Sequence, residues 1–179
     1  MTLDPAMDAT LRALLALLLA GAALRKLAAP AGFRAAVHEY RIVPAAAVGA
    51  VSIGLVAAEI VLAVALGVPA LRRAALTAVA ALLLVYAAAI AINLARGRAI
   101  DCGCGGPAAG RPISGWLVVR NVALATVALA AACPVATRPL VWIDAVTIVA
   151  ATAGLALLYA ATDRLVRHAP ALAALREPS

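Results

Sequence analysis

Five apolar runs follow one another in this sequence, each close to the roughly 20 residues that an α-helix needs to cross a bilayer. Apolar residues make up 66% of the 179-residue chain, and its mean hydropathy is +1.07. A soluble domain cannot bury so large an apolar fraction, so the outside of the folded chain must be apolar too. We therefore predict an all-α fold: an integral membrane bundle of about five transmembrane helices with a four-helix core. The expected spans are residues 7–24, 42–66, 74–94, 116–135 and 140–161, in a single domain covering residues 1–179.

Basic residues lie mainly between the apolar runs and give the chain a net charge of +7. In that position they contact lipid headgroups and orient the spans, so membrane lipid is an expected partner and nucleic acid is not. The segment from Pro30 to Arg41 places Phe33, Val37 and Tyr40 at helical spacing. This pattern predicts a short amphipathic helix in the membrane interface.

Alternating spans would divide the 15 Lys and Arg residues between the two ends of the bundle. Four of them would lie at the N-terminal end, namely Arg12, Arg72, Arg73 and Arg138. The other eleven, which include Arg25 and Lys26 directly after the first run, would lie at the opposite end. Because Lys and Arg are enriched on the cytoplasmic side, this count predicts an external N-terminus and an internal loop after the third run.

The loop after the third run is rich in glycine and contains the motif Cys102-Gly103-Cys104. A disulfide between cysteines separated by one residue is strained, and strain favours exchange over structural cross-linking. Gly103 would relax the backbone between the two thiols. The third cysteine, Cys133, stands at the far end of the fourth run, where we expect it to pack within the helix or to act as a relay thiol on the opposite membrane face.

Charged residues surround the thiol motif: Arg96 and Arg98 come shortly before it, and Asp101 directly precedes it. Positive charge favours the nucleophilic thiolate, whereas Asp101 would oppose that effect or accept a proton. We interpret Cys102 and Cys104 as a catalytic redox pair. The alternatives are two inert thiols or a soft-metal site, although two thiolates without a nearby histidine make a thin ligand set, and no metal is expected.

Glu59 lies inside the second run, where a carboxylate costs a few kcal/mol and indicates a specific role. It could carry a proton, form a hydrogen bond to a quinone or tie helices together, with Tyr86, Asn93 and Asn121 as possible partners. Arg120 and Asn121 open the fourth run, where they either contact headgroups or fold back toward the thiol loop.

The most specific pattern in the chain is Asp101-Cys-Gly-Cys followed by the pair Arg120-Asn121. With it, the chain resembles the methylamine utilisation protein MauE family, which is DoxX-like, over roughly residues 10 to 135. Gly105 is a departure, because the resemblance leads us to expect a bulky aromatic residue after the second cysteine; this affects packing beside the thiols and not the thiols themselves. Supporting matches are Phe33, Tyr40-Arg41, Pro44, Glu59, Arg96-Gly97, Gly106 and Ile113 to Leu117.

The resemblance implies a redox-associated protein of the bacterial plasma (inner) membrane that works with a thioredoxin-like partner. The family is implicated in maturing the disulfide-rich small subunit of methylamine dehydrogenase, but members also occur without that enzyme, so methylamine metabolism is not implied for this chain. The resemblance also implies that the thiols face the extracytoplasmic side. This disagrees with the count of basic residues, and the side stays open.

Three functions remain. In the first, Cys102 and Cys104 exchange disulfides with the thioredoxin-like partner while electrons pass to or from a membrane carrier. A quinone is the possible carrier, by analogy with vitamin K epoxide reductase-like enzymes. In the second, the chain is a non-catalytic assembly factor that anchors such a partner through the amphipathic segment from Pro30 to Arg41 and the basic loop after the third run. In the third, it is a small proton-coupled transporter that uses Glu59.

Overall fold

The computed structural model describes residues 2–98 and 113–174, and its regular structure within these ranges is helical, as predicted. Two 3₁₀ turns, Ala45–Ala47 and Pro69–Leu71, precede the third and fourth helices. The α-helices of the described ranges are α1 Pro5–Ala28, α2 Pro30–Glu39, α3 Val48–Ala65, α4 Arg72–Ala95, α5 Gly115–Ala131 and α6 Trp142–Ala174.

Proline residues set the boundaries of the first two helices. Asp4 caps α1, since its Oδ1 accepts a hydrogen bond of 2.8 Å from the backbone N–H of Ala6, and Pro5 follows at the start of the helix. The residue before a proline disfavours helical geometry, so α1 ends at Ala28, Ala29 caps it, and Pro30 begins α2. The short amphipathic helix predicted from Pro30 is therefore present.

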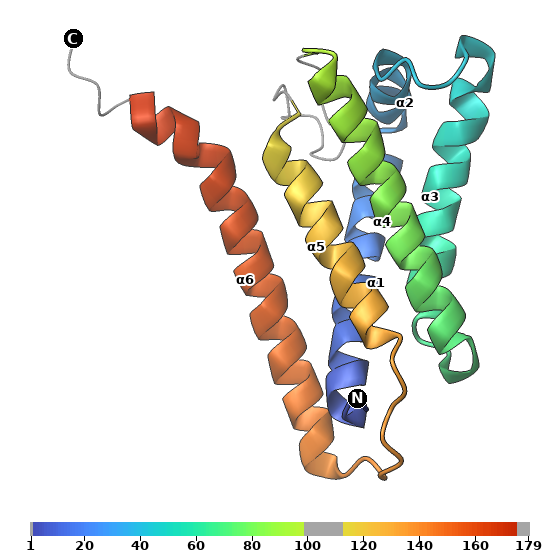
Figure 1. Cartoon of the computed structure of the whole chain (residues 1–179), viewed down its shortest axis with the longest axis vertical. Helices are drawn as coiled ribbons and strands as arrows, with labels where there is room; N and C mark the ends of the chain where they lie inside the picture. The colour runs from blue at the N-terminus through green and yellow to red at the C-terminus, as the bar shows by residue number, and fades with distance from the viewer. Residues whose placement is uncertain (1, 99–112, 175–179) are drawn as a thin grey trace.

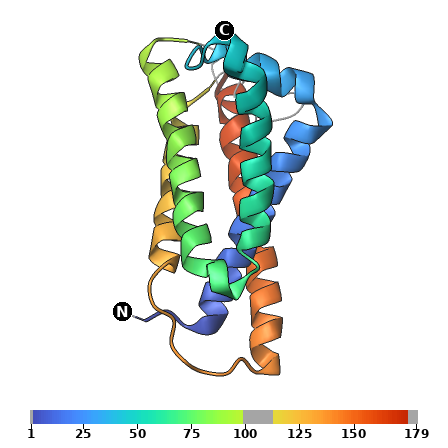
Figure 2. The same cartoon turned by 90° about the vertical axis from the view of Figure 1, so that its right-hand side faces the viewer.

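The four helices α1, α3, α4 and α5 form a bundle, and α6 packs against α1 at its side (Figures 1 and 2). The bundle core consists of Leu and Ala residues from facing helices, with Val79 among them, and the most extensive packing joins α4 to α5. Ala at the α5 positions lets these two helices approach closely. The core residues are Leu15, Leu19, Leu66, Ala75, Leu76, Val79, Ala80, Leu83, Ala125, Ala128 and Ala131.

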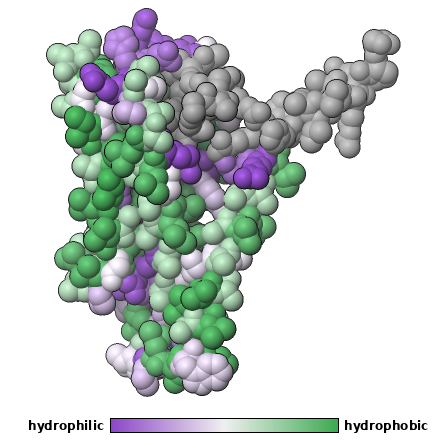
Figure 3. Space-filling view, turned by 180° about the vertical axis from the view of Figure 1, so that it is seen from behind, coloured by the Kyte–Doolittle hydropathy of each residue, from purple (hydrophilic) through white to green (hydrophobic). Residues whose placement is uncertain are grey.

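Four helical stretches are long and apolar enough to cross a membrane: Pro5–Ala28, Ala45–Ala65, Pro69–Ala95 and Trp142–Leu165. The predicted fourth span is shorter than expected, because α5 has 17 residues and is about 26 Å long against a hydrocarbon core of about 30 Å. The fifth is longer, since α6 continues well past the predicted end at 161. Apolar side chains cover the flank of the bundle, and hydrophilic ones gather at the end that carries α2 (Figure 3).

Ion pairs tie the helices together at the N-terminal end of the bundle. Asp8, which is 3% exposed, accepts hydrogen bonds from Arg12 at 2.9 Å and from Arg72 at 2.7 Å. Arg72 also donates to the backbone carbonyls of Ala131 and Cys133, where α5 has ended. One guanidinium thus connects α1, α4 and the C-terminus of α5, whose carbonyls have no partner within their own helix.

Candidate functional site

A buried ion pair lies inside the bundle near the end that carries α2. The ammonium of Lys26, in the last turn of α1, donates a hydrogen bond to Oε1 of Glu59 in the middle of α3. The hydroxyl of Tyr86 in α4 donates to the same oxygen at 2.8 Å and accepts from Lys26 at 3.3 Å. Lys26 is 4% exposed and Glu59 is fully buried. Three helices therefore meet at a charged pair that is buried inside the bundle.

Aromatic rings complete the surroundings of the ammonium. Its nitrogen lies 5.0 Å from the ring centre of Phe33 in α2 and 4.9 Å from that of Tyr86. Ring faces attract a cation that has left water, so both rings help to hold Lys26 in place. The second carboxylate oxygen of Glu59, Oε2, has no hydrogen-bond partner among the described residues.

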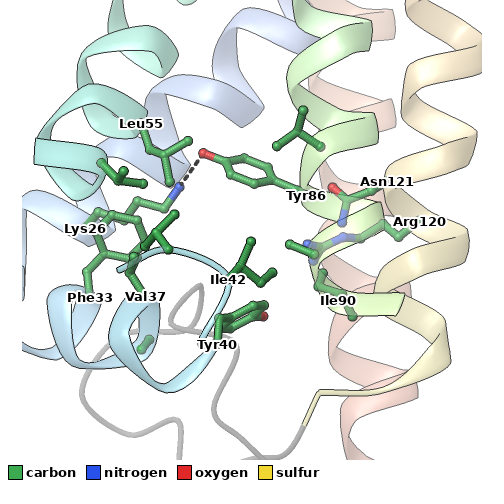
Figure 4. Close-up of a pocket in the computed structure, with 15 residues that line it drawn as sticks. Lys26, Phe33, Val37, Tyr40, Ile42, Leu55, Tyr86, Ile90, Arg120 and Asn121 are labelled. Carbon is green, nitrogen blue, oxygen red and sulfur yellow. Dashed lines mark hydrogen bonds between the residues drawn. The ribbon is translucent and has the colours of Figure 1, made fainter. Parts of the chain in front are cut away.

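The Lys26 ammonium and Tyr86 form part of the wall of a cavity of about 190 Å³ that lies between the helices (Figure 4). Most of the wall is apolar. Figure 4 shows Lys26 on one side of the cavity, Arg120 and Asn121 of α5 on the other, and Tyr86 reaching from α4 toward Lys26. The wall is lined by Lys26, Phe33, Ala36, Val37, Tyr40, Ile42, Val43, Val51, Leu55, Val85, Tyr86, Ala89, Ile90, Arg120 and Asn121.

Arg120 and Asn121 reach this cavity from the first half of α5. The Arg120 guanidinium forms an ion pair with Asp163 of α6 at 3.3 Å, and both side chains are mostly buried. The Asn121 amide nitrogen donates to the carbonyl of Leu117 at 2.8 Å. The pair therefore lies inside the bundle. The second interpretation, a fold back toward the thiol loop, stays a prediction because that loop is outside the described residues.

The segment with the thiol motif leaves the bundle at the same end. Gly97, at φ 66°, closes α4 with hydrogen bonds from Gly97 N–H to Leu94 and from Arg98 N–H to Asn93. This is a Schellman motif, which requires the left-handed conformation that glycine adopts without strain. Arg98 also donates to the carbonyl of Glu39 at 3.5 Å, at the end of α2. Arg98, the last described residue before the thiol segment, is thus held beside α2. Its partner Glu39 directly precedes Tyr40, which lines the cavity.

The predicted site residues fall into three groups. Cys102 and Cys104, with Asp101 and Gly103, lie outside the described residues. Arg96 is the C-terminal cap of α4 and is exposed. The remaining three, Glu59, Arg120 and Asn121, are brought to one region of the bundle, where the latter two line the cavity and Glu59 holds the lysine that lines it.

Sequence reasoning missed Lys26, which was assigned to the headgroup region after the first run. Among the expected partners of Glu59, Tyr86 is confirmed, whereas the amides of Asn93 and Asn121 donate within their own helices. Two features of the sequence point to Lys26. It is the one lysine in the chain, and it continues the buried helical face of Leu15, Leu19 and Ala23.

Cys133 does not pack within a helix. It lies two residues beyond the end of α5 and is exposed at the N-terminal end of the bundle. The fourth run therefore ends sooner than its hydropathy suggests, because Pro134 follows and the chain turns back toward Leu3.

The fold and the cavity define a multi-pass membrane protein whose helical bundle encloses a polar-edged chamber near one end. The family model described as "Methylamine utilisation protein MauE" matches residues 5–134. The chain therefore belongs to the MauE family, as the resemblance implied.

Curated relatives support this assignment. The chain is 46% identical to "Methylamine utilization protein MauE" of Paracoccus denitrificans over 68% of this chain and 66% of that protein. Its identity to the protein of the same description from Paracoccus versutus is 40%, over 90% and 88% of the two chains. For Methylophilus methylotrophus it is 36%, over 91% and 87%. No solved structure matches the chain.

Proposed function

We propose that this protein exchanges disulfides with a thioredoxin-like partner, through Cys102 and Cys104, during maturation of an exported, disulfide-containing protein. The bacterial plasma membrane is the compartment that such a role requires. The observation that supports the proposal is the position of the described residues that flank the thiol motif. Arg98 contacts the end of α2, and Arg120 and Asn121 line the cavity beside it. The described residues that precede and follow the motif in the sequence thus bring charged and polar groups to a single end of the bundle.

The chemistry is a dithiol–disulfide exchange whose atoms balance. One thiolate of the pair attacks a sulfur of the partner's disulfide, breaks that bond and forms a mixed disulfide. The second thiolate then attacks the sulfur of the first cysteine, which breaks the mixed disulfide and releases the partner as a dithiol. The pair ends as a disulfide, having given up two electrons. Return to the dithiol state requires the same two electrons and two protons from a second donor, and the reverse direction requires an acceptor.

The test compares thiol exchange by purified, reconstituted protein and three single variants: Cys102→Ser, Cys104→Ser and, as the matched control, Cys133→Ser. The partner is a thioredoxin-like domain whose two thiols are followed by alkylation and mass shift. We expect the first two variants to lose net exchange and one of them to accumulate a mixed disulfide. Cys133→Ser should match the unaltered protein, because Cys133 follows the C-terminus of α5, whereas the thiol motif precedes the N-terminus of that helix in the sequence.

Exchange at the unaltered rate in both Cys102→Ser and Cys104→Ser would overturn the proposal. If those variants also supported maturation in cells, the non-catalytic assembly factor would become the better account. The exposed face of α2, with Arg34, His38 and Glu39, would then be the surface for such a partner.

A further inference from the structure

We infer that the cavity beside Lys26 and Tyr86 binds the headgroup of a neutral, lipid-soluble ring compound with hydrogen-bond-accepting carbonyls, which is the chemistry of a quinone. This inference deepens the proposed function, on which it rests, because disulfide exchange needs a second redox partner. It concerns binding by the described residues only.

The size and lining of the cavity select a flat ring. A cavity of about 150 Å³ is known to hold a benzene molecule, and this one measures about 190 Å³, so it can take one substituted ring but no phospholipid headgroup with its chains. The chain contains one Phe and three Tyr residues, and Phe33, Tyr40 and Tyr86 all line this cavity. Aromatic rings pack well against another planar ring.

The charges of the wall select a neutral ligand. The cation Lys26 is already matched by Glu59, and Arg120 by Asp163. No net positive charge is therefore left among these four residues to favour a carboxylate or a phosphate.

The polar groups that face the cavity are mainly hydrogen-bond donors. Lys26 carries three N–H groups, and the described residues give its ammonium two hydrogen-bond partners. The amide nitrogen of Asn121 has two N–H groups and donates one to Leu117. The remaining N–H groups of Lys26 and Asn121 can donate hydrogen bonds to carbonyl oxygens of a ligand.

The cavity also has a route to the lipid. Val85 lines it from the middle of α4 and is 58% exposed, and Ile42 lines it near the start of the second span and is 45% exposed. A residue that both lines the cavity and is exposed on the apolar flank of the bundle indicates that the cavity opens toward the hydrocarbon core of the membrane. A ligand with an apolar tail could therefore enter sideways and leave its tail among the lipid chains.

The experiment measures saturation binding of decylubiquinone to the purified full chain by native mass spectrometry. Dodecanoate, phosphatidylglycerol and decylbenzene are the comparison probes, which supply an anion, a phospholipid and a tail without carbonyls. We expect decylubiquinone to bind at least about tenfold more tightly than each of them, a difference of about 1.4 kcal/mol.

Two substitutions on α4 locate the site. Val85→Trp should fill the opening and weaken decylubiquinone binding about tenfold or more, or ~1.4 kcal/mol. Leu84→Trp is the matched control, because Leu84 is 44% exposed on the same helix and does not line the cavity. A third variant, Glu59→Gln, should shift preference toward dodecanoate, since it leaves Lys26 without its counter-charge.

The inference would be overturned if Val85→Trp and Leu84→Trp lost the same amount of affinity for decylubiquinone. It would also be overturned if dodecanoate, phosphatidylglycerol or decylbenzene bound as tightly as decylubiquinone. The double variant Cys102→Ser/Cys104→Ser separates it from the proposed function. Decylubiquinone should bind this variant as it binds the unaltered protein. If the unaltered protein binds decylubiquinone but does not exchange disulfides, the proposed function alone is wrong. If it exchanges disulfides but does not bind decylubiquinone, this inference alone is wrong.

Discussion

Lys26 shows how one residue escapes prediction from sequence. The first apolar run ends at Leu24, so a lysine two positions later looks like a headgroup contact. In the structure α1 continues to Ala28, and the residue lies on the face of the helix that points into the bundle. Glu59 was predictable as a functional or structural residue because a carboxylate inside an apolar run carries a free-energy cost that a specific role must offset. A basic residue near the end of a run carries no such cost.

Replacing Lys26 by Met should destabilise the protein by about 3 kcal/mol, because it leaves the Glu59 carboxylate buried without its counter-charge. The measurement is the free energy of unfolding in detergent, from denaturant titration followed by circular dichroism. Arg25→Met is the matched control: Arg25 is the adjacent basic residue, but it is exposed, and surface substitutions change stability by about 0.5 kcal/mol or less.

The double variant Lys26→Met/Glu59→Met makes this prediction specific to the pair. Removing both charges together leaves no unmatched group, so stability should return to within about 1 kcal/mol of the unaltered protein. A double variant as unstable as Lys26→Met alone would mean that the ammonium stabilises the bundle through contacts other than Glu59.

At the scale of elements, the helices themselves were predictable and their ends were not. Hydropathy located all five apolar helices and the amphipathic α2, since both patterns are local. The end of α5 was misjudged for two reasons. Pro134 stops the helix sooner than hydropathy suggests, and Arg72, on α4, donates hydrogen bonds to the carbonyls of Ala131 and Cys133. A contact between residues about 60 positions apart leaves no trace in local periodicity.

Arg72→Gln should destabilise the bundle by about 2 kcal/mol, because buried Asp8 loses one of its two cations and the end of α5 loses its donor. Hydrogen exchange should also quicken in the last turn of α5 and stay unchanged in α2. Arg73→Gln is the matched control, as Arg73 is exposed beside it. Equal effects of the two substitutions would show that the network does not fasten these helices.

For the whole molecule, the family and the all-α membrane fold followed from the sequence, but its cavity did not. The lining residues come from α1 to α5 and the connection after α2, and no short motif relates segments so far apart. The structure also alters the count of basic residues. Leaving out the ion-paired residues takes Lys26 and Arg120 from the eleven expected at one end, which leaves nine. It also takes Arg12, Arg72 and Arg138 from the four at the other end, which leaves one. The count therefore still favours an internal thiol loop.

Differential alkylation of the protein in isolated membranes tests the redox pair most directly. Membranes carrying the Cys133→Ser protein are treated with one maleimide, reduced, and treated with a second, heavier maleimide before mass spectrometry. We predict that Cys102 and Cys104 take the heavier label together in membranes exposed to an oxidised thioredoxin-like domain, and the lighter label after exposure to its reduced form. Uptake of the lighter label by both cysteines under every condition would contradict a reversible thiol pair.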